Sequence, residues 1–334
     1  MSKRCTNVRA RRGRGGFTLV ELLVVVAVIA LLIGVLLPAL AGARASGQQA
    51  QAANNIRQML IGLTAWSTEN DLLIPGINTT GSEYDGLPNT DVLDRSPVRA
   101  AQNWDWLSNS LAQDGLPNRR LPRMAALFSE YGDPTVGQEL TATDLTGLES
   151  DEVEQLESEL GGSITAPSYF MPMGFQYAGE TIDAGGGDIR QWGAPSPERE
   201  AVSLPENWFP RLTSIGQESL KVAVADGAVR LDPSRTIDAG PFADPTQTEN
   251  YGLFGMAPPT WTDSPNYAAE PGRVELAYRH NGRMNAGFFD GHLELLEPDE
   301  SQEPKLWYPK GSVYEGTNTP EAVDRRYDSG DFID

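Results

Sequence analysis

The sequence has few of the side chains that most often carry out catalysis or bind metals. It contains one cysteine and two histidines among 334 residues. A single cysteine excludes an internal disulfide framework and any zinc site that needs several cysteines. No phosphate-cradling glycine loop, nucleophile elbow or zinc-binding pattern occurs along the chain. We therefore expect no enzymatic activity, no cofactor and no metal site.

Basic side chains are also scarce, and they are unevenly placed. Lys and Arg total 26 against 46 Asp and Glu, which gives a formal net charge of −20. Residues 1–16 hold six of the basic side chains and no acid, so residues 17–334 carry a formal charge of −26. An acidic surface repels a phosphate backbone, which argues against nucleic acid as a partner. Positive charge before an apolar segment and negative charge after it predicts a cytoplasmic N-terminus and an exported acidic part.

Residues 17–43 form a long apolar run. Glu21 is its only charged residue, and residues 22–43 are an uncharged stretch of 22 residues. A helix of about 20 apolar residues crosses a ~30 Å hydrocarbon layer, so this segment is long enough to span a membrane. It can be a signal peptide cleaved at the A-x-A pattern of residues 39–41, a plain uncleaved anchor, or a segment with a special function. The abrupt junction at residues 14–17 and the acid inside the run favour the third, because a charge near hydrocarbon is costly unless it is paired.

Residues 16–21, GFTLVE, resemble the processing site of type IV prepilins and of the pseudopilins of type II secretion. The resemblance implies that a membrane peptidase cleaves after Gly16 and methylates the new terminal amine of Phe17. Glu21 is then the fifth residue of the mature chain, where this family has a nearly invariant acid. The implied role of Glu21 is to pair with the terminal amine of a neighbouring subunit in the apolar core of a fibre. Pro38 becomes the twenty-second residue, where many members of the family have a helix-kinking proline.

The apolar run continues into a predicted amphipathic helix. We expect helix from residue 17 to about residue 70, made of a transmembrane and assembly part (17–43) and an amphipathic continuation (44–72). The continuation should place one apolar face against the rest of the protein. The residues that recur at this helical spacing are Ile56, Met59, Leu60 and Leu63.

Residues 73–334 are predicted to form an exported globular head. The clearest β signal lies in residues 274–296, where Asn281-Gly282 and Asp290-Gly291 separate three short runs and predict two-residue turns. The predicted fold class is α+β: a pilin-like long N-terminal helix packed on an antiparallel β-sheet head with long loops. With two-residue turns, the apolar face expected to pack on the long helix consists of Ala277, Met284, Ala286, Phe288, Leu293 and Leu295. The opposite face consists of His280, Arg283, Asn285, Phe289, His292 and Glu294.

Residues 280–291 match an H-X9-DG motif, in which nine residues separate a histidine from Asp-Gly; here these are His280 and Asp290-Gly291. This motif resembles that of large pilin-like proteins, numerous in planctomycete-type bacteria, that carry prepilin N-termini. The predicted meander places His280 and Asp290 near opposite ends of one strand, about 20 Å apart, which is too far for shared metal ligation. We therefore favour a structural role in turns, with Asp290 as a side-chain acceptor and Gly291 in a left-handed conformation, over metal binding or catalysis.

Three other head segments have recognisable patterns. Residues 221–231 predict a hairpin with a turn at Asp226-Gly227. Residues 149–160 predict an acidic, solvated helix ended by two glycines, and their acids lack the alternating spacing of a calcium loop. Residues 306–334 are polar and are expected to be an exposed or partly disordered tail.

The function expected from these patterns is structural. The resemblance implies a single-pass inner-membrane prepilin-like subunit of a type IV pilus or a type II secretion pseudopilus, with its head in the periplasm or at the cell surface. Its implied partners are the prepilin peptidase and N-methyltransferase, other pilin or pseudopilin subunits, and an inner-membrane assembly platform. The competing interpretation is a membrane- or fibre-anchored binding module that recognises envelope polysaccharide or another protein, for which seven tryptophans could supply stacking surfaces.

Overall fold

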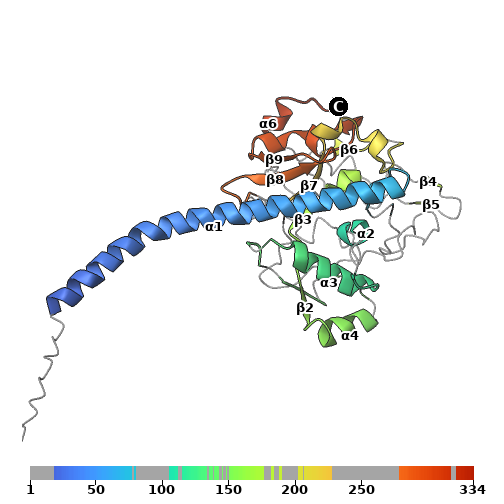
Figure 1. Ribbon diagram of the computed structural model, residues 1–334. Coiled ribbons are helices and arrows are strands. Elements are labelled where there is room, and N and C mark those ends of the chain that lie inside the picture. Colours follow the sequence, from blue (N-terminus) through green and yellow to red (C-terminus); the bar gives the residue numbers. More distant parts are fainter. Residues whose placement is uncertain are drawn as a thin grey trace, which may run out of the picture. The chain divides into compact units, whose positions relative to one another are not determined.

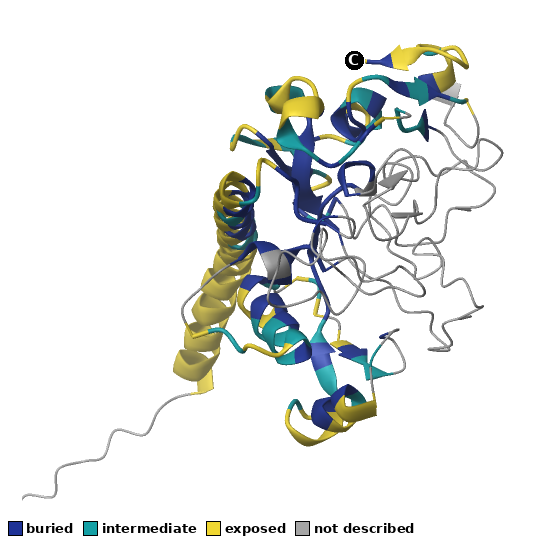
Figure 2. Ribbon diagram, turned by 90° about the vertical axis from the view of Figure 1, so that its right-hand side faces the viewer, coloured by how far each residue is buried: buried dark blue, intermediate teal, exposed yellow. Residues whose placement is uncertain are grey.

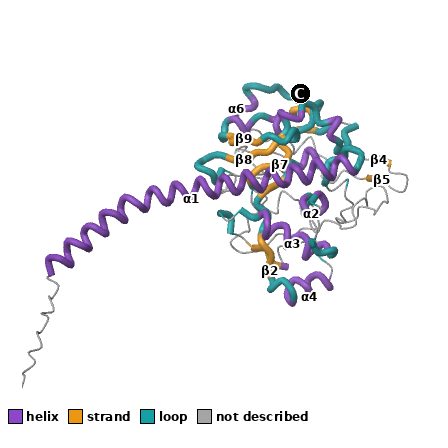
Figure 3. Tube along the Cα trace, in the orientation of Figure 1, coloured by secondary structure: helices purple, strands orange, loops and turns teal. Residues whose placement is uncertain are grey.

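The computed structural model describes residues 19–76, 79, 105–111, 115–133, 135–137, 139–142, 145, 148, 150–176, 182–183, 188–189, 202–205, 207–227, 278–316 and 321–334. Figures 1 and 3 show its helices and strands. The helices are α1 (Leu19–Glu69), α2 (Leu107–Ser110), α3 (Arg120–Tyr131), α4 (Ser150–Ser158) and α6 (Glu321–Asp324). Short 3-10 turns are η2 (Met173–Phe175), η3 (Leu212–Ser214), η4 (Glu218–Leu220), η5 (Glu300–Gln302) and η6 (Pro304–Leu306). The strands are β1 (Glu139–Thr141), β2 (Ser163–Thr165), β3 (Tyr169–Phe170), β4 (Ile182–Asp183), β5 (Asp188–Ile189), β6 (Val202–Ser203), β7 (Val222–Asp226), β8 (Met284–Phe288), β9 (Leu293–Leu296), β10 (Ser312–Tyr314) and β11 (Phe332–Ile333).

Helix α1 is 51 residues long and belongs to two compact units, Met1–Gly47 and Gln48–Asp334. The described part of the first unit is helix throughout. The second unit contains the end of α1 and all other elements. The long N-terminal helix predicted from the sequence is thus confirmed, as is the α+β class with antiparallel sheets in the head.

The last part of α1 packs into the head along one stripe. The four apolar residues predicted for this stripe are all buried, together with Ala52, Asn55, Trp66 and Ser67. Asn55 also ties α1 to α3, because its Nδ2 donates a hydrogen bond to the Tyr131 carbonyl oxygen at 3.2 Å. The opposite face stays in solvent, as the 57% exposure of Ile61 shows. A stripe repeating every three to four residues is what buries one face of a helix, so the pattern here predicted the packing correctly.

The central sheet has the order β3-β7-β8-β9, and all its pairs are antiparallel. Strand β7 is fully buried and lies between β3 and β8, which both pair with it at Ala225. The second strand of the predicted 221–231 hairpin lies outside the described residues. Because both edges of β7 are paired at Ala225, the described partners of this strand are β3 and β8. The first strand of the predicted meander also lies mostly outside the described residues, but its Asn281-Gly282 turn is present, with hydrogen bonds of 3.2 Å in both directions between His280 and Arg283.

The connection between β8 and β9 is one residue longer than predicted. The register of the pairs Met284–Leu296 and Gly287–Leu293 sets Phe288 opposite His292, which leaves a loop of three residues, 289–291. Phe288 N–H donates to the His292 carbonyl oxygen at 3.0 Å, and Gly291 has φ +91°, the left-handed residue that a three-residue hairpin loop uses. A shift of one residue moves every side chain of a strand to the other face. The predicted face was therefore wrong for β9: Leu293 and Leu295 share a face with Gly287 and Asn285, not with Ala286.

The predicted helix-facing side of β8 was also wrong. Helix α1 contacts the sheet at Gly287, where an added Cβ would lie 2.5 Å from Ile56 Cγ2 and 2.8 Å from Leu60 Cδ1. Both faces of β8 are buried, so the strand contains no polar alternation that would indicate which face meets the helix. The missing side chain at Gly287 lets α1 approach the backbone of β8.

Replacing Gly287 with alanine is expected to lower the unfolding free energy by about 1–3 kcal/mol, because a methyl group has no room between β8 and the branched side chain of Ile56. The measurement is chemical unfolding of the full chain in detergent. Gly47→Ala is the matched control, because nothing lies within 4 Å of the Cβ it would add. The head of Gly47→Ala should have the same unfolding free energy as that of the parent. Equal stability of Gly287→Ala and Gly47→Ala would contradict the close contact.

The described residues of the polar tail, 306–316 and 321–334, are folded, which corrects the prediction of an exposed or partly disordered tail. Strand β10 pairs with both β11 and β6 in a second antiparallel sheet. Trp307, Tyr308 and Tyr314 are buried, and Trp307 Nε1 donates to the Ser301 carbonyl oxygen at 2.7 Å. Figure 2 shows buried residues in these strands close to the C-terminus. A few aromatic side chains thus anchor a segment whose average composition is polar.

The acidic helix is present as α4, and Gly161 and Gly162 follow it with φ of +75° and +87°. The prediction that the acids of this helix are solvated was wrong for one of them. Glu152 is buried and accepts two hydrogen bonds from Arg120, at 2.6 Å from Nε and 2.7 Å from Nη2. This bidentate pair joins α4 to α3.

Lys221 is buried just before β7 and holds two distant segments together. Its Nζ donates to the main-chain oxygen of Lys305 at 2.8 Å and to that of Asp334 at 3.0 Å. Burial lowers the pKa of Lys221 from 10.5 to about 8, against the opposing charge of Asp334. Between these two values the unfolded chain binds more protons than the folded chain, so this group makes the unfolding free energy rise with pH.

We expect the parent protein to gain stability relative to Lys221→Met as the pH rises from 8 to 10, by at most about 1.4 kcal/mol per pH unit. Unfolding of both proteins at pH 8, 9 and 10 measures this. Arg119→Met is the control, since Arg119 is exposed and its side-chain pair with Glu159 spans 3.8 Å. Parallel pH profiles for the parent and Lys221→Met would contradict the account.

Candidate functional site

The predicted processing residues, Gly16 and Phe17, lie outside the described residues. Helix α1 begins two residues later, and Glu21 lies in its first turn. Pro38 lies inside α1, with helix on both sides of it. The bend implied at Pro38 by the family resemblance stays a prediction.

The first half of α1 is apolar and does not pack within its own unit. Its large apolar side chains from Leu19 to Leu40 are 46–78% exposed. The most apolar window of the helix has a mean hydropathy of 3.2 and none of it is buried, so α1 is long and apolar enough to cross a membrane. Exposed apolar surface of this extent is unfavourable in water and favours lipid or other protein chains as its surroundings.

Comparison with known families gives a match in this region. Residues 11–37 match the model of the prokaryotic N-terminal methylation motif. The match includes Gly16, Phe17 and Glu21, and it supports a prepilin-type protein. Such a motif implies processing by a prepilin peptidase and assembly with pilin-type subunits, and together with the apolar helix it fits a single-pass inner-membrane anchor.

The comparisons do not extend this likeness to the head. No curated protein and no solved structure matches the chain. The resemblance of the H-X9-DG segment to large pilin-like proteins therefore stays a prediction, as does the choice between pilus and pseudopilus.

The structure separates the residues of the H-X9-DG motif into two environments. Asp290 is in the exposed β8–β9 connection, where its Oδ1 accepts from the His292 N–H at 3.1 Å and contacts His292 Nδ1 at 2.5 Å. Gly291 follows with its positive φ. His280, by contrast, is buried against two aspartates, Asp133 and Asp226. The motif residues thus form no common site in the described part of the chain.

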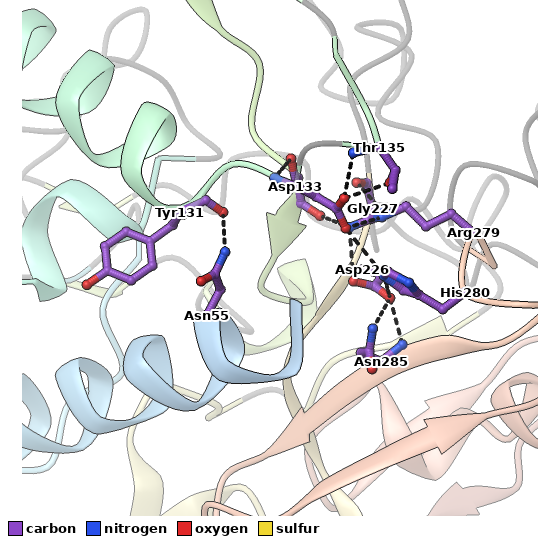
Figure 4. Close-up of polar contacts among 10 residues, drawn as sticks. Asn55, Tyr131, Asp133, Thr135, Asp226, Gly227, Arg279, His280 and Asn285 are labelled. Atoms are coloured by element: carbon purple, nitrogen blue, oxygen red, sulfur yellow. Dashed lines mark hydrogen bonds and ion pairs between the residues drawn. The ribbon is translucent and has the colours of Figure 1, made fainter. Parts of the chain in front are cut away.

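His280 belongs to a buried polar cluster around Arg279 (Figure 4). We define the cluster as Asp133, Asp226, Arg279 and His280. Asp133 follows the end of α3, Asp226 ends β7, and the other two precede the turn into β8. Arg279 Nε donates to Asp133 Oδ2 at 2.8 Å, and its Nη2 donates to Asp226 Oδ1 at 2.9 Å.

Arg279 also satisfies backbone groups of the same region. Its Nη1 donates to the Gly227 carbonyl oxygen and its Nη2 to that of Ser168, both at 2.9 Å. The guanidinium lies 5.5 Å from the centre of the Tyr169 ring. A planar group with five donors can join several segments at once, and Arg279 joins the end of α3, the approach to β3 and the end of β7.

The two carboxylates experience different electrostatics. Burial raises the pKa of Asp226, and the nearby Arg279 and His280 offset this only in part. Burial acts on Asp133 in the same direction, but contacts with His280, Arg279 and Thr135 outweigh it and lower the pKa of Asp133 below its usual range. Burial disfavours the charge of Arg279, yet the two aspartates hold the pKa of Arg279 above its ordinary value.

Sequence reasoning missed this cluster. Asp226 was interpreted as a turn residue, Asp133 and Arg279 were not singled out, and His280 was assigned to a turn. Arg279 and Asp133 are 146 residues apart, so no local spacing links them. In the sequence, a histidine next to an arginine is a weak signal of a buried cluster, because arginine is mostly exposed in folded proteins and histidine is only intermediate in burial.

Proposed function

We propose that this chain is a structural subunit of a type IV pilus or a type II secretion pseudopilus, cleaved after Gly16 and N-methylated on Phe17. The observation that carries the proposal is the methylation motif at residues 11–37, which leads directly into a helix with exposed apolar side chains. In this proposal the chain is a substrate of the prepilin peptidase and catalyses no reaction itself. It waits in the inner membrane with its N-terminus cytoplasmic and its head exported, and an assembly platform then adds it to a fibre.

The mechanism of addition rests on charge pairing in an apolar surrounding. Cleavage after Gly16 creates a positive amine four residues before Glu21. A carboxylate and an amine that leave the lipid interface for a fibre core are each costly alone, and pairing between neighbouring subunits removes much of that cost. Only a subunit at the right axial position can form the pair, so the pair sets the register as well as the affinity.

Gly16→Val is expected to block cleavage and leave the full-length precursor in the membrane, because a branched side chain replaces the glycine at the proposed cleavage point. Gly13→Val is the matched control, since it makes the same change three residues upstream and should be processed like the parent. Both variants are expressed with the prepilin peptidase and compared by gel mobility and by recovery in sheared fibres. Normal processing of Gly16→Val, or equal blockage of both variants, would contradict the proposed cleavage site.

A further inference from the structure

Three side chains of the buried polar cluster direct potential metal-binding atoms at one another (Figure 4). Asp133, Asp226 and His280 each contribute one such atom, and the three atoms lie within 4.8 Å of one another. They come from three separate segments, at the ends of α3 and β7 and before β8. All three residues are buried.

The separations suit a small ion with short bonds. His280 Nε2 is 3.3 Å from Asp133 Oδ2 and 3.5 Å from Asp226 Oδ2. Four ligands about 2.0–2.2 Å from a tetrahedral zinc ion lie roughly 3.3–3.5 Å from one another. Charge-assisted hydrogen bonds, by comparison, are about 2.7–2.9 Å long. Both contacts of His280 therefore resemble the edges of a coordination shell more closely than ion-pair hydrogen bonds.

His280 Nε2 is the least satisfied atom of the cluster. It is buried and has no hydrogen-bond partner of acceptable geometry among the described residues. The side chain is only 3% exposed. A buried nitrogen that makes no hydrogen bond of good geometry costs free energy, and either a metal ion or a proton between this atom and the two carboxylates would remove that cost.

Surrounding donors hold the two carboxylates in place. Thr135 donates to Asp133 Oδ1 through its main-chain N at 2.8 Å and its Oγ1 at 2.6 Å. Asn285 donates to Asp226 Oδ2 through its main-chain N at 2.7 Å and its Nδ2 at 2.9 Å. Together with Arg279, these groups orient both carboxylates, as the hydrogen bonds around metal ligands do. Both donors of Asn285 go to Asp226 Oδ2, and Arg279 Nε donates to Asp133 Oδ2, so these two oxygens already accept hydrogen bonds.

We propose that Asp133, Asp226 and His280 bind one divalent transition-metal ion of the zinc type. A nitrogen ligand and a set of three protein ligands fit zinc better than calcium, which takes six to eight oxygens. Two aspartates and Arg279 carry a net charge of −1, which attracts a cation, and a divalent ion would change that charge to +1. The ion would fasten the end of α3, the end of β7 and the turn before β8 to one another. A proton on His280 is the competing occupant.

Metal binding is tested on the full chain purified in detergent. Metal content is measured on protein prepared without chelator, and chelator-treated protein is then incubated with ZnCl2 or CoCl2. We expect one metal per chain, the visible absorption of four-coordinate Co²⁺ with nitrogen and oxygen ligands, and a Tm rise of roughly 5–10 °C in saturating ZnCl2. CaCl2 should give no comparable shift.

Two substitutions identify the site. His280→Gln should lose the bound metal and the Co²⁺ spectrum, whereas His292→Gln should keep both, since His292 is a partly exposed histidine outside the buried polar cluster. If His280→Gln does not fold, the metal content and spectrum of the parent and of His292→Gln still decide the question. Absence of metal uptake by the parent overturns the proposal and leaves a proton as the occupant. Loss of uptake in His292→Gln, or its retention in folded His280→Gln, also overturns it.

Discussion

Replacing Glu21 with alanine is expected to remove the protein from assembled fibres while leaving it cleaved and inserted in the membrane. In the proposed assembly the Glu21 carboxylate meets the methylated amine of the neighbouring subunit in an apolar core. Removing one partner of a buried ion pair leaves the other charge unpaired, at a cost of about 3–5 kcal/mol. Incorporation should therefore fall by about two orders of magnitude or more. The measurement is the ratio of fibre-bound to membrane-bound protein.

Two variants separate this role from a local effect on the helix. An acid in the first turn also favours the positive end of a helix, by about 0.3–1 kcal/mol, so a purely local role predicts only a small loss. Glu21→Gln keeps the shape of the side chain but removes its charge, and it should fail to assemble, as Glu21→Ala does. Glu154→Ala removes an exposed acid of α4 and should assemble normally. Fibre incorporation of Glu21→Ala at the parent level would exclude the pairing mechanism.

Arg279→Met is expected to cause a large loss of head stability. Two buried carboxylates, Asp133 and Asp226, lose the guanidinium that pairs with both of them, and the carbonyls of Ser168 and Gly227 lose their donors. Breaking a buried ion-pair network costs about 3–5 kcal/mol, which for a head of this size lowers the Tm by on the order of 10 °C. Thermal unfolding of the full chain in detergent, followed by circular dichroism, measures the change.

Arg119→Met is the matched control for this prediction. Arg119 pairs with Glu159 at 3.8 Å, and their side chains are 55% and 59% exposed. An exposed pair of this kind contributes about 0–1 kcal/mol, so the control should unfold close to the parent. A similar small effect for both substitutions would show that the buried polar cluster does not hold the head together.

The elements that local pattern determines were predicted well from the sequence. Helix α1 was expected from residue 17 to about 70 and is described from Leu19 to Glu69, because the apolar run and the later stripe are both strongly helical signals. Helix α4 was predicted from its acids and its terminal glycines. The Asn281-Gly282 turn was predicted from its two residues alone, and both have positive φ, at +56° and +76°.

Features that depend on tertiary contacts were not predictable in the same way. One extra residue in the β8–β9 connection changed the face of β9. The dipeptide Asp290-Gly291 suits both a two-residue turn and a three-residue loop, so its sequence does not tell which of the two forms. The side of β8 that faces α1 is the side of Gly287. This glycine lies next to Ile56 and Leu60, which are far away in the chain, so the sequence around it does not indicate the contact. The buried polar cluster required three distant segments to meet, which explains why Asp133 and Arg279 passed unnoticed.

The mature N-terminus tests the central claim most directly. The protein is extracted from membranes of cells that contain the prepilin peptidase, and its intact mass and N-terminal peptide are determined by mass spectrometry. We expect a chain that begins at Phe17 and carries one methyl group on its terminal amine. A chain that begins after Ala41, or one that keeps residues 1–16, would contradict the assignment as a prepilin-type subunit.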